Sequence, residues 1–246
     1  MTSTWAFLMI KVGCCGFPVK RDIYYRSFPV VEVQQTFYQL PLITTGRRWK
    51  EEAPPNFEFT MKAWQLITHE PSSPTYRRLR MTITEEKRKD YGFFKETEEV
   101  DEAWSRTAEF AKALGAKKIL FQSPASFYAS NDHIRKLRRF FRKIESQPFI
   151  FIWEPRGRWV REEVERICTE LGIIPCLDPF GRKSIQGDLL YVRLHGRMGY
   201  RYTYSEEEMK ELIRLGETFS QVYLMFNNIS MYEDALHLQE LLEKKE

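Results

Sequence analysis

Short segments rich in β-branched and aromatic residues recur along the chain, and most precede an amphipathic helical pattern. The predicted strands are residues 9–13, 30–33, 57–62, 118–122, 149–153, 173–177, 189–194 and 222–226. The predicted helices are residues 101–114, 133–144, 160–171, 205–215 and 232–244. Eight strands with intervening helices predict an α/β fold, the (β/α)8 TIM-type barrel. A doubly wound open sheet is the alternative, but no Gly-rich dinucleotide-binding turn follows a predicted strand.

No internal repeat or low-complexity linker interrupts this pattern, so we expect a single domain over residues 1–246. Residues 1–8 precede a segment that resembles a natural start, and we expect them to be either an extension or the product of an upstream start codon. The connection over residues 63–100 is long and carries two charged runs, 76–80 and 85–89. In a barrel such a connection lies at the carboxyl face, where long loops often act as lids. A solvated excursion without a role is the alternative.

Composition limits the classes of partner and compartment. The net charge of +4 and the pI near 8.8 permit an acidic partner without requiring one. No apolar run approaches the ~18 residues of a membrane span, so we expect no membrane partner and a cytoplasmic protein. Charged residues make up 29% of the chain, a composition typical of thermophiles. C-x-x-C spacing is absent from the four cysteines, which argues against a zinc ribbon or thioredoxin motif.

The seventh predicted strand, residues 189–194, carries charge on one face. Side chains alternate along a strand, so Tyr191, Arg193 and His195 share the face opposite three aliphatic side chains. An unpaired buried charge is costly, and Arg193 therefore needs an acidic partner, an anionic ligand or water. A structural ion pair within the fold and a position at the mouth of a site both meet that need.

Ordered motifs along the chain resemble one known family. Residues 31–41, VEVQQTFYQLP, resemble the VEINSTFY-x-LP signature of the YecE-like family of unknown function (DUF 72). Further matches are FEFTMKA at 57–63 with Thr68-His69, LFQSP at 120–124 with Ser126-Phe127, WEPR at 153–156 with Trp159, YVRLHG at 191–196 and FNN at 226–228. The opening GCCGF at 13–17 departs from the family's GTSGW form. The resemblance implies a TIM-type barrel and supplies no established reaction.

Polar side chains stand at the ends of the predicted strands. Barrel interiors are usually layers of branched apolar residues, and catalytic sites are built at the carboxyl ends of the strands. The polar residues are Glu32 and Gln34 on the second strand, Lys62 on the third, Gln122 on the fourth, Glu154 on the fifth, Asp178 on the sixth and Asn227 on the eighth. We therefore expect a functional site at the carboxyl mouth of the barrel.

The residue types at these ends predict acid–base chemistry on an anionic substrate. The predicted substrate-binding residues are Lys62, Arg193, Arg156, Arg197, Gln34, Tyr38, Gln122, Tyr191 and Asn227. Arginine binds phosphate or carboxylate through two parallel hydrogen bonds. The predicted catalytic residues are Glu154 as general base, His195 as acid or second base, and the carboxylates Glu32 and Asp178. In the alternative, Glu154 pairs with Arg193 and Glu32 with Lys62 in a network that catalyses nothing.

Two other chemistries remain open at the same face. Glu32, Glu154, Asp178 and His195 could surround Mg²⁺ or Mn²⁺, although the neighbouring cations would repel a metal. Cys14, Cys15 and Cys176 lie near strand ends and could supply a thiolate nucleophile. Small cysteines in a barrel core are the alternative.

Nucleic acid is a candidate partner besides an anionic small molecule. Helix residues 134–144 keep five apolar side chains on one face and six bases on the rest, and residues 197–204 interleave Arg and Tyr. Cations that hold phosphates and aromatics that stack bases suit single strands. We thus predict a hydrolase acting on a phosphate-bearing substrate, of phosphodiesterase or nuclease type. The alternatives are a carbohydrate-active isomerase or glycosidase with Glu32 and Glu154 as its carboxylate pair, and a non-catalytic module that binds nucleic acid or protein.

Overall fold

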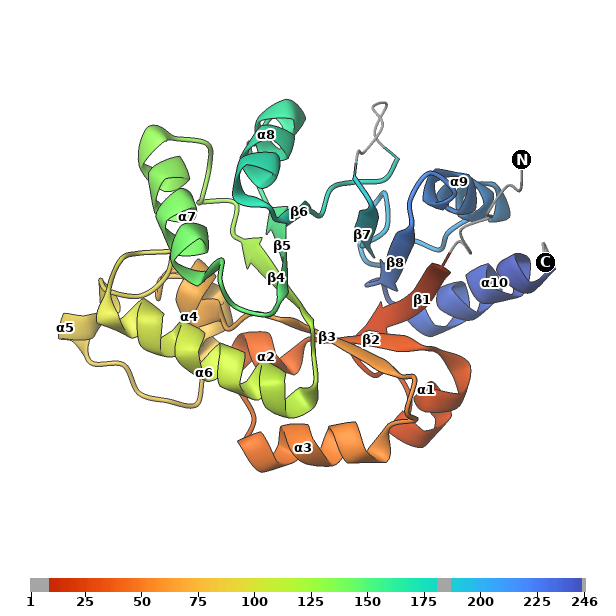
Figure 1. The fold of residues 1–246 in the computed structure, drawn as a ribbon, viewed down its shortest axis with the longest axis horizontal. Coiled ribbons are helices and arrows are strands. Elements are labelled where there is room, and N and C mark those ends of the chain that lie inside the picture. Colours follow the sequence, from red (N-terminus) through yellow and green to blue (C-terminus); the bar gives the residue numbers. More distant parts are fainter. Residues whose placement is uncertain (1–8, 181–186, 245–246) are drawn as a thin grey trace. The chain divides into compact units, whose positions relative to one another are not determined.

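Eight strands form one sheet in the order β6-β5-β4-β3-β2-β1-β8-β7 (Figure 1). The computed structural model describes residues 9–180 and 187–244, so the predicted extension at residues 1–8 lies outside the described residues. The strands are β1 (Met9–Cys15), β2 (Val30–Val33), β3 (Glu58–Lys62), β4 (Lys118–Ser123), β5 (Ile150–Pro155), β6 (Ile174–Pro175), β7 (Leu189–Leu194) and β8 (Gln221–Phe226). Parallel strands that alternate with helices along the chain confirm the predicted (β/α)8 TIM-type fold.

Helices follow most strands. They are α1 (Arg21–Ser27), α2 (Gln35–Tyr38), α3 (Ile43–Glu52), α4 (Gln65–Thr68), the 3₁₀ helix η1 (Pro74–Arg78), α5 (Glu85–Arg88), α6 (Glu98–Leu114), α7 (Asn131–Ile144), α8 (Arg161–Leu171), α9 (Glu206–Gly216) and α10 (Met231–Glu243). The starts of two helices are fixed by N-cap side chains. Thr97 accepts a hydrogen bond from Val100 N at the start of α6, and Ser130 accepts one from His133 N at the start of α7. Helix α9 begins with a capping box between Ser205 and Glu208.

Every predicted strand overlaps an observed one. Strand β6 is shorter than expected, with Ile174 and Pro175 in place of residues 173–177. Pro175 has no backbone N–H to continue the ladder, which accounts for the early end. Helix α6 starts three residues before the predicted position because Thr97, rather than a later residue, is its cap.

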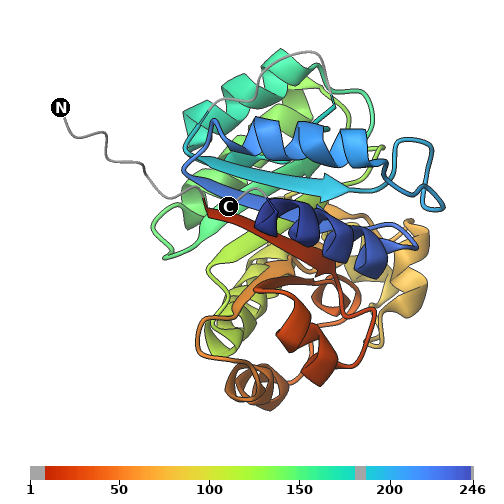
Figure 2. The ribbon, with the colours of Figure 1, turned by 90° about the vertical axis from the view of Figure 1, so that its right-hand side faces the viewer.

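The described residues gather into two compact units, residues 9–32 with 176–180 and 187–244, and residues 33–175. The expectation of one domain stays a prediction. In the first unit, β1 pairs with β8 and β8 pairs with β7, and α10 packs on β1 and β8 (Figure 2). Strand β7 is buried along its length, so even Arg193 lies within the packed interior.

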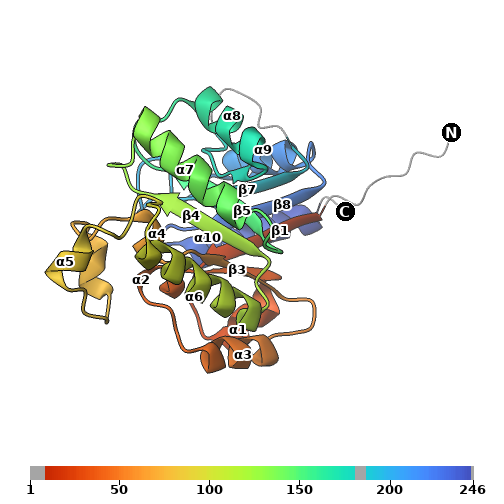
Figure 3. The same cartoon turned by 60° about the vertical axis from the view of Figure 1, so that its left-hand side comes forward.

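The second unit holds β3, β4 and β5 under helices α6 and α7 (Figure 3). Its core is unusually aromatic, with rings that meet tilted or edge to face at centroid distances of 5–6 Å. The contributing rings are Phe94, Trp104, Phe121, Phe140, Phe141 and Phe151. Strand register places Gln122 of β4 beside Glu154 of β5.

The long connection between β3 and β4 returns to its own starting point. Gly92 N donates to Leu66 O at 2.8 Å and Phe94 N to Ile67 O at 2.9 Å. The return turn is left-handed, with φ of +80° at Gly92 and +53° at both Phe93 and Phe94. Such angles are costly for aromatic residues and require a packed surrounding to persist.

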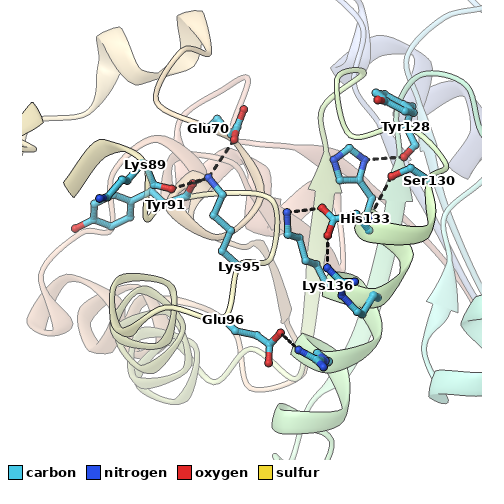
Figure 4. Close-up of polar contacts among 12 residues, drawn as sticks. Glu70, Lys89, Tyr91, Lys95, Glu96, Tyr128, Ser130, His133 and Lys136 are labelled. Carbon is cyan, nitrogen blue, oxygen red and sulfur yellow. Dashed lines mark hydrogen bonds and ion pairs between the residues drawn. The ribbon is translucent and has the colours of Figure 1, made fainter. Parts of the chain in front are cut away.

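Polar contacts fasten the same return segment (Figure 4). Lys95 Nζ lies 3.0 Å from Glu70 Oε1 and donates to the carbonyl oxygens of Lys89 and Tyr91. Glu96 forms an ion pair with Arg139 of α7. The excursion over residues 63–100 is therefore anchored near both ends, and α5 projects from it (Figure 3).

Candidate functional site

A buried ion pair organises the carboxyl end of β7 in the first unit. Arg193 Nε lies 3.0 Å from Glu32 Oε1, and the two side chains are 1% and 0% exposed. Tyr191 donates its hydroxyl to Glu32 Oε2 at 2.7 Å. Both carboxylate oxygens are thus engaged, which compensates for moving the charges out of water. This geometry favours a structural role for Glu32 and Arg193 among the predicted site residues.

His195 is the half-buried end of the same strand face. Its Nε2 lies 3.5 Å from Arg193 Nη1, and its Nδ1 lies 2.9 Å from the side-chain amide of Asn227. The atom of Asn227 at this distance is the amide nitrogen Nδ2, which can only donate, so Nδ1 is the accepting nitrogen of the ring in this contact. His195 and Asn227, which were predicted separately as catalytic and substrate-binding residues, are therefore brought together.

In the second unit, a line of hydrogen bonds crosses the carboxyl ends of β3, β4 and β5. Lys62 Nζ donates to Gln122 Oε1 at 2.8 Å, and Gln122 Nε2 donates to Glu154 Oε2 at 2.8 Å. Arg156 Nη2 closes the line 2.7 Å from Glu154 Oε1. Because the Lys62 ammonium can only donate, it fixes the amide of Gln122 with its nitrogen toward Glu154. Four predicted residues are thus brought together.

Exposure varies along this line. Lys62 and Glu154 are only 6% and 5% exposed, whereas the Arg156 side chain is 41% exposed. The Lys62 ammonium also lies 3.6 Å from the centroid of the Phe37 ring. A ligand that approached from solvent would therefore meet Arg156 first, with the lysine and the carboxylate behind it.

His69 lies close to this line and stays neutral. Its ring packs against Phe37 at 4.9 Å, and Thr68 Oγ1 lies 2.8 Å from Nδ1. Burial, reinforced by the positive charge of Lys62, lowers the pKa of His69 from 6.5 to about 3. The site therefore contains a histidine that does not carry charge near neutral pH.

The Arg–Tyr loop after β7 is held by Glu208 of α9. Arg197 Nη1 lies 3.2 Å from Glu208 Oε1, and Tyr202 donates to the same oxygen at 2.6 Å. Burial raises the pKa of Glu208, but the hydrogen bonds from Tyr202, Ser205 and Arg197 outweigh burial and leave the pKa below its usual value. The guanidinium of Arg197 is thus bound to the carboxylate of Glu208.

Three other predicted residues are exposed or half-buried. Asp178 is exposed and accepts a hydrogen bond from Phe180 N at 3.0 Å. Gln34 is half-buried at the start of α2. Tyr38 is half-buried beneath the guanidinium of Arg78, 3.5 Å from its ring centroid.

The cysteines have the properties of core residues. Cys14, Cys15, Cys168 and Cys176 are all free and buried. Burial raises the pKa of the Cys14 thiol to about 12, and it raises the pKa of Cys168 as well. Thiols in this state are poor nucleophiles.

The bases of α7, which the sequence marked as a nucleic-acid surface, are all paired with acids. Arg135 and Lys136 contact Asp132, Arg138 and Arg142 contact Glu170, Arg139 contacts Glu96, and Lys143 contacts Asp101. The six bases share four carboxylates, which leaves a net charge of +2 on this face, so it is a weaker candidate for nucleic acid than the number of bases suggests.

Within residues 9–180 and 187–244, no three His, Cys, Asp or Glu side chains gather in a way that could hold a metal ion. The set Glu32, Glu154, Asp178 and His195 is therefore not found as a ligand group in that part of the chain. Over the same residues, no helix is both long and apolar enough to cross a membrane.

Sequence reasoning missed several residues that support these clusters. Phe37 belongs to the motif at residues 31–41 that resembles the family signature, but no sequence pattern indicates that its ring lies beneath the Lys62 ammonium. Arg78 lay in a charged run whose position against Tyr38 depends on the path of the excursion. Glu208 was visible as an acid in the first turn of a capped helix, which does not reveal its contacts with Arg197 and Tyr202.

The parallel strand order, with helices between the strands, defines a TIM-type barrel protein. Comparison with known families makes the assignment specific. The chain belongs to the family described as "Protein of unknown function DUF72", whose model matches residues 20–246.

Related proteins agree with this assignment. The chain is 21% identical to the UPF0759 protein YunF of Bacillus subtilis (strain 168), over 91% of this chain and 86% of that protein. A DUF72 family protein from Thermotoga maritima MSB8 is similar in structure, with a TM-score of 0.70 and 24% identity over 96% of this chain and 99% of that one. For a DUF72 family protein from Enterococcus faecalis V583 the TM-score is 0.73, with 20% identity over 96% and 98%.

A more distant structural neighbour lies outside the family. A xylose isomerase domain containing protein from Salmonella typhimurium LT2 has a TM-score of 0.57 and 14% identity, covering 92% of this chain and 91% of that one. At that level of identity the likeness shows the fold alone.

Proposed function

We propose that the chain is an enzyme that performs acid–base chemistry on a phosphate-bearing substrate at the carboxyl ends of β3, β4 and β5. The observation that carries the proposal is the line from Lys62 through Gln122 and Glu154 to Arg156. It places a carboxylate between two cations at the end of a TIM-type barrel where catalytic sites are built. The proposal depends only on residues within 33–175.

In this proposal Arg156 is the first group to bind the substrate. Its guanidinium is the most exposed part of the line, and arginine binds phosphate oxygens through two parallel hydrogen bonds. When Arg156 turns toward a phosphate, its ion pair with Glu154 Oε1 is exchanged for the phosphate, and Glu154 acts as the proton acceptor. Lys62 then stabilises the negative charge that develops on the phosphoryl oxygens.

The reaction proposed is hydrolysis of a phosphate ester. Glu154 accepts a proton from a water molecule as its oxygen bonds to phosphorus, and the bond from phosphorus to the leaving oxygen breaks. Glu154 then returns the proton to that leaving oxygen, so the products are a phosphate and an alcohol. Gln122 is a positioning residue that holds the carboxylate through its amide N–H.

Three p-nitrophenyl substrates test the reaction class: the phosphate monoester, the bis-ester and the β-glucoside. We expect release of p-nitrophenol from a phosphate ester by the wild type. Glu154→Gln should lower kcat at least 100-fold, and Lys62→Met should raise KM and lower kcat. Cleavage of the glucoside alone would instead favour the carbohydrate-active alternative.

A matched control comes from the opposite ends of the same strands. Glu58 begins β3 and lies 3.4 Å from Lys118, which begins β4. Glu58→Gln removes one negative charge from the same unit, as Glu154→Gln does, and should leave the kinetics unchanged. Isothermal titration with inorganic phosphate provides an independent measurement, and the absence of any phosphate binding by the wild type would contradict the proposal.

A further inference from the structure

Two adjacent aromatic residues of α2 each carry a cation on the ring face. Lys62 Nζ lies 3.6 Å from the centroid of Phe37, and Arg78 Cζ lies 3.5 Å from the centroid of Tyr38. The two rings are themselves neighbours, 5.0 Å apart and nearly perpendicular. The lysine comes from the end of β3 and the arginine from the excursion. The excursion thus delivers a second positive charge beside the proposed site.

The segment that carries Arg78 has a defined position. Tyr76 donates its hydroxyl to His69 O at 2.8 Å, and Arg80 N donates to Gln39 Oε1 at 3.2 Å. The first contact ties η1 to the residue after α4, and the second ties the chain just after η1 to the residue after α2. The N–H bonds of a guanidinium lie in the plane of the group. When the guanidinium covers an aromatic ring, these N–H groups therefore point sideways and can still donate to an anion.

The charges of this segment differ from the charges of α7. Arg77, Arg78 and Arg80 are exposed, and over residues 9–180 and 187–244 none of the three pairs with a carboxylate. All six bases of α7, by contrast, pair with an acid. Three arginines within four positions repel one another, and an anionic ligand would relieve that repulsion.

We propose that Arg77, Arg78 and Arg80 bind the phosphodiester backbone of a single-stranded nucleic acid and lead it to Lys62. This inference rests on the proposed function and names its substrate class. Successive arginines suit a chain of phosphates better than one compact anion. The strand is single because Lys62 and Glu154 are recessed, at 6% and 5% exposure, and a paired backbone could not bend into them.

Fluorescence anisotropy with a labelled 15-nucleotide oligo(dT) tests the assignment over a series of salt concentrations. The test variant is R77A/R78A/R80A, and the matched control is R135A/R138A/R142A, which removes the same charge from the paired face of α7. We expect the test variant to bind at least tenfold more weakly at about 0.1 M salt. Its log–log salt slope should be shallower by about two, since each single-strand phosphate contact contributes about 0.7. The control should stay within about twofold of the wild type.

Several outcomes would overturn the inference. Equal weakening by the two triple variants would mean that net charge alone is responsible. Binding of a duplex as tight as that of oligo(dT) would remove the single-strand assignment, and no binding by the wild type would remove the site. Circular dichroism and thermal melting establish that each variant is folded, and R78K, which keeps the charge, should retain most of the affinity.

The inference and the proposed function can fail separately. If R77A/R78A/R80A binds oligo(dT) as the wild type does, while E154Q and K62M lose cleavage of bis(p-nitrophenyl) phosphate, the inference fails and the proposed function stands. If E154Q and K62M keep that activity, the proposed function fails.

Discussion

Arg193 and Glu32 form an ion pair that is closed to solvent, with Nε 3.0 Å from Oε1. Removal of one partner would leave the other charge buried without its main compensation. We expect Arg193→Met to lower the free energy of unfolding by about 3–5 kcal/mol, measured by urea denaturation. Tyr191→Phe, which removes the hydroxyl on Glu32 Oε2, should cost about 1–3 kcal/mol.

An exposed pair in the same unit is the control for that measurement. Arg26 and Asp22 lie 3.3 Å apart on α1, with side chains 73% and 67% exposed. Arg26→Met should change the free energy of unfolding by less than about 1 kcal/mol. Similar small losses at Arg26 and Arg193 would show that Arg193 is not a structural residue.

The neutral state of His69 makes stability depend on pH. The pKa of His69 is about 3 in the folded chain and near 6.5 in the unfolded chain, so the unfolded chain binds the proton more readily. Stability from His69 is therefore present above pH 6.5 and is lost as pH falls from about 6.5 toward about 3, by up to about 1.4 kcal/mol per pH unit.

Urea unfolding between pH 4.5 and 6.5 measures this dependence. His69→Phe keeps a ring against Phe37 and removes the titrating group, so its stability should vary less with pH than that of the wild type. Nuclear magnetic resonance of the imidazole protons follows the group directly. A His69 signal that titrates near pH 6.5 in the folded protein would contradict the expectation.

The left-handed turn at Gly92 has no room for a side chain. A Cβ there would lie 2.3 Å from His69 O, in addition to the strain of φ at +80°. We expect Gly92→Ala to cost about 3 kcal/mol or more. Gly172 has φ of +62° with no atom within 4 Å of its Cβ position, and Gly172→Ala should cost only about 1–2 kcal/mol. Equal losses of unfolding free energy in the two variants would mean that backbone strain alone, and not the contact with His69 O, accounts for the effect of Gly92→Ala.

The buried thiols should not react in the folded protein. Burial raises the pKa of Cys14 to about 12, so almost no thiolate is present at pH 8. With Ellman's reagent at pH 8 we expect negligible modification of the native chain and four modified cysteines after unfolding in urea. Rapid labelling of one native thiol would reopen nucleophilic catalysis by cysteine.

The strands of this fold could be predicted from sequence because buried parallel strands are runs of apolar residues with clear ends. Helices α1, α2 and α3 were missed because they are short, at seven, four and ten residues, and also lack a side-chain hydrogen bond from their N-cap residues, Lys20, Gln34 and Leu42. Without a cap there is no local start signal, and α2 is only four residues long.

For the site, sequence supplied the residues but not their partners. Strand ends predicted Lys62, Gln122 and Glu154, since the fold class alone brings such ends to one face. The ion pair of Glu32 with Arg193 joins β2 to β7, and its identity depends on the register of intervening strands, which no local pattern encodes. Arg78 against Tyr38 depends likewise on the path of a long connection.

The backbone bonds that join Gly92 to Leu66 and Phe94 to Ile67 have an evolutionary consequence. They bring the two ends of the intervening chain together, so the segment between them can lengthen, shorten or be exchanged without altering the strands on either side. In a barrel built in this way, Arg77, Arg78 and Arg80 lie on a segment that can be replaced as a unit. Related proteins with the same barrel could then bind different ligands through a different segment at this position, while the aromatic core stays the same.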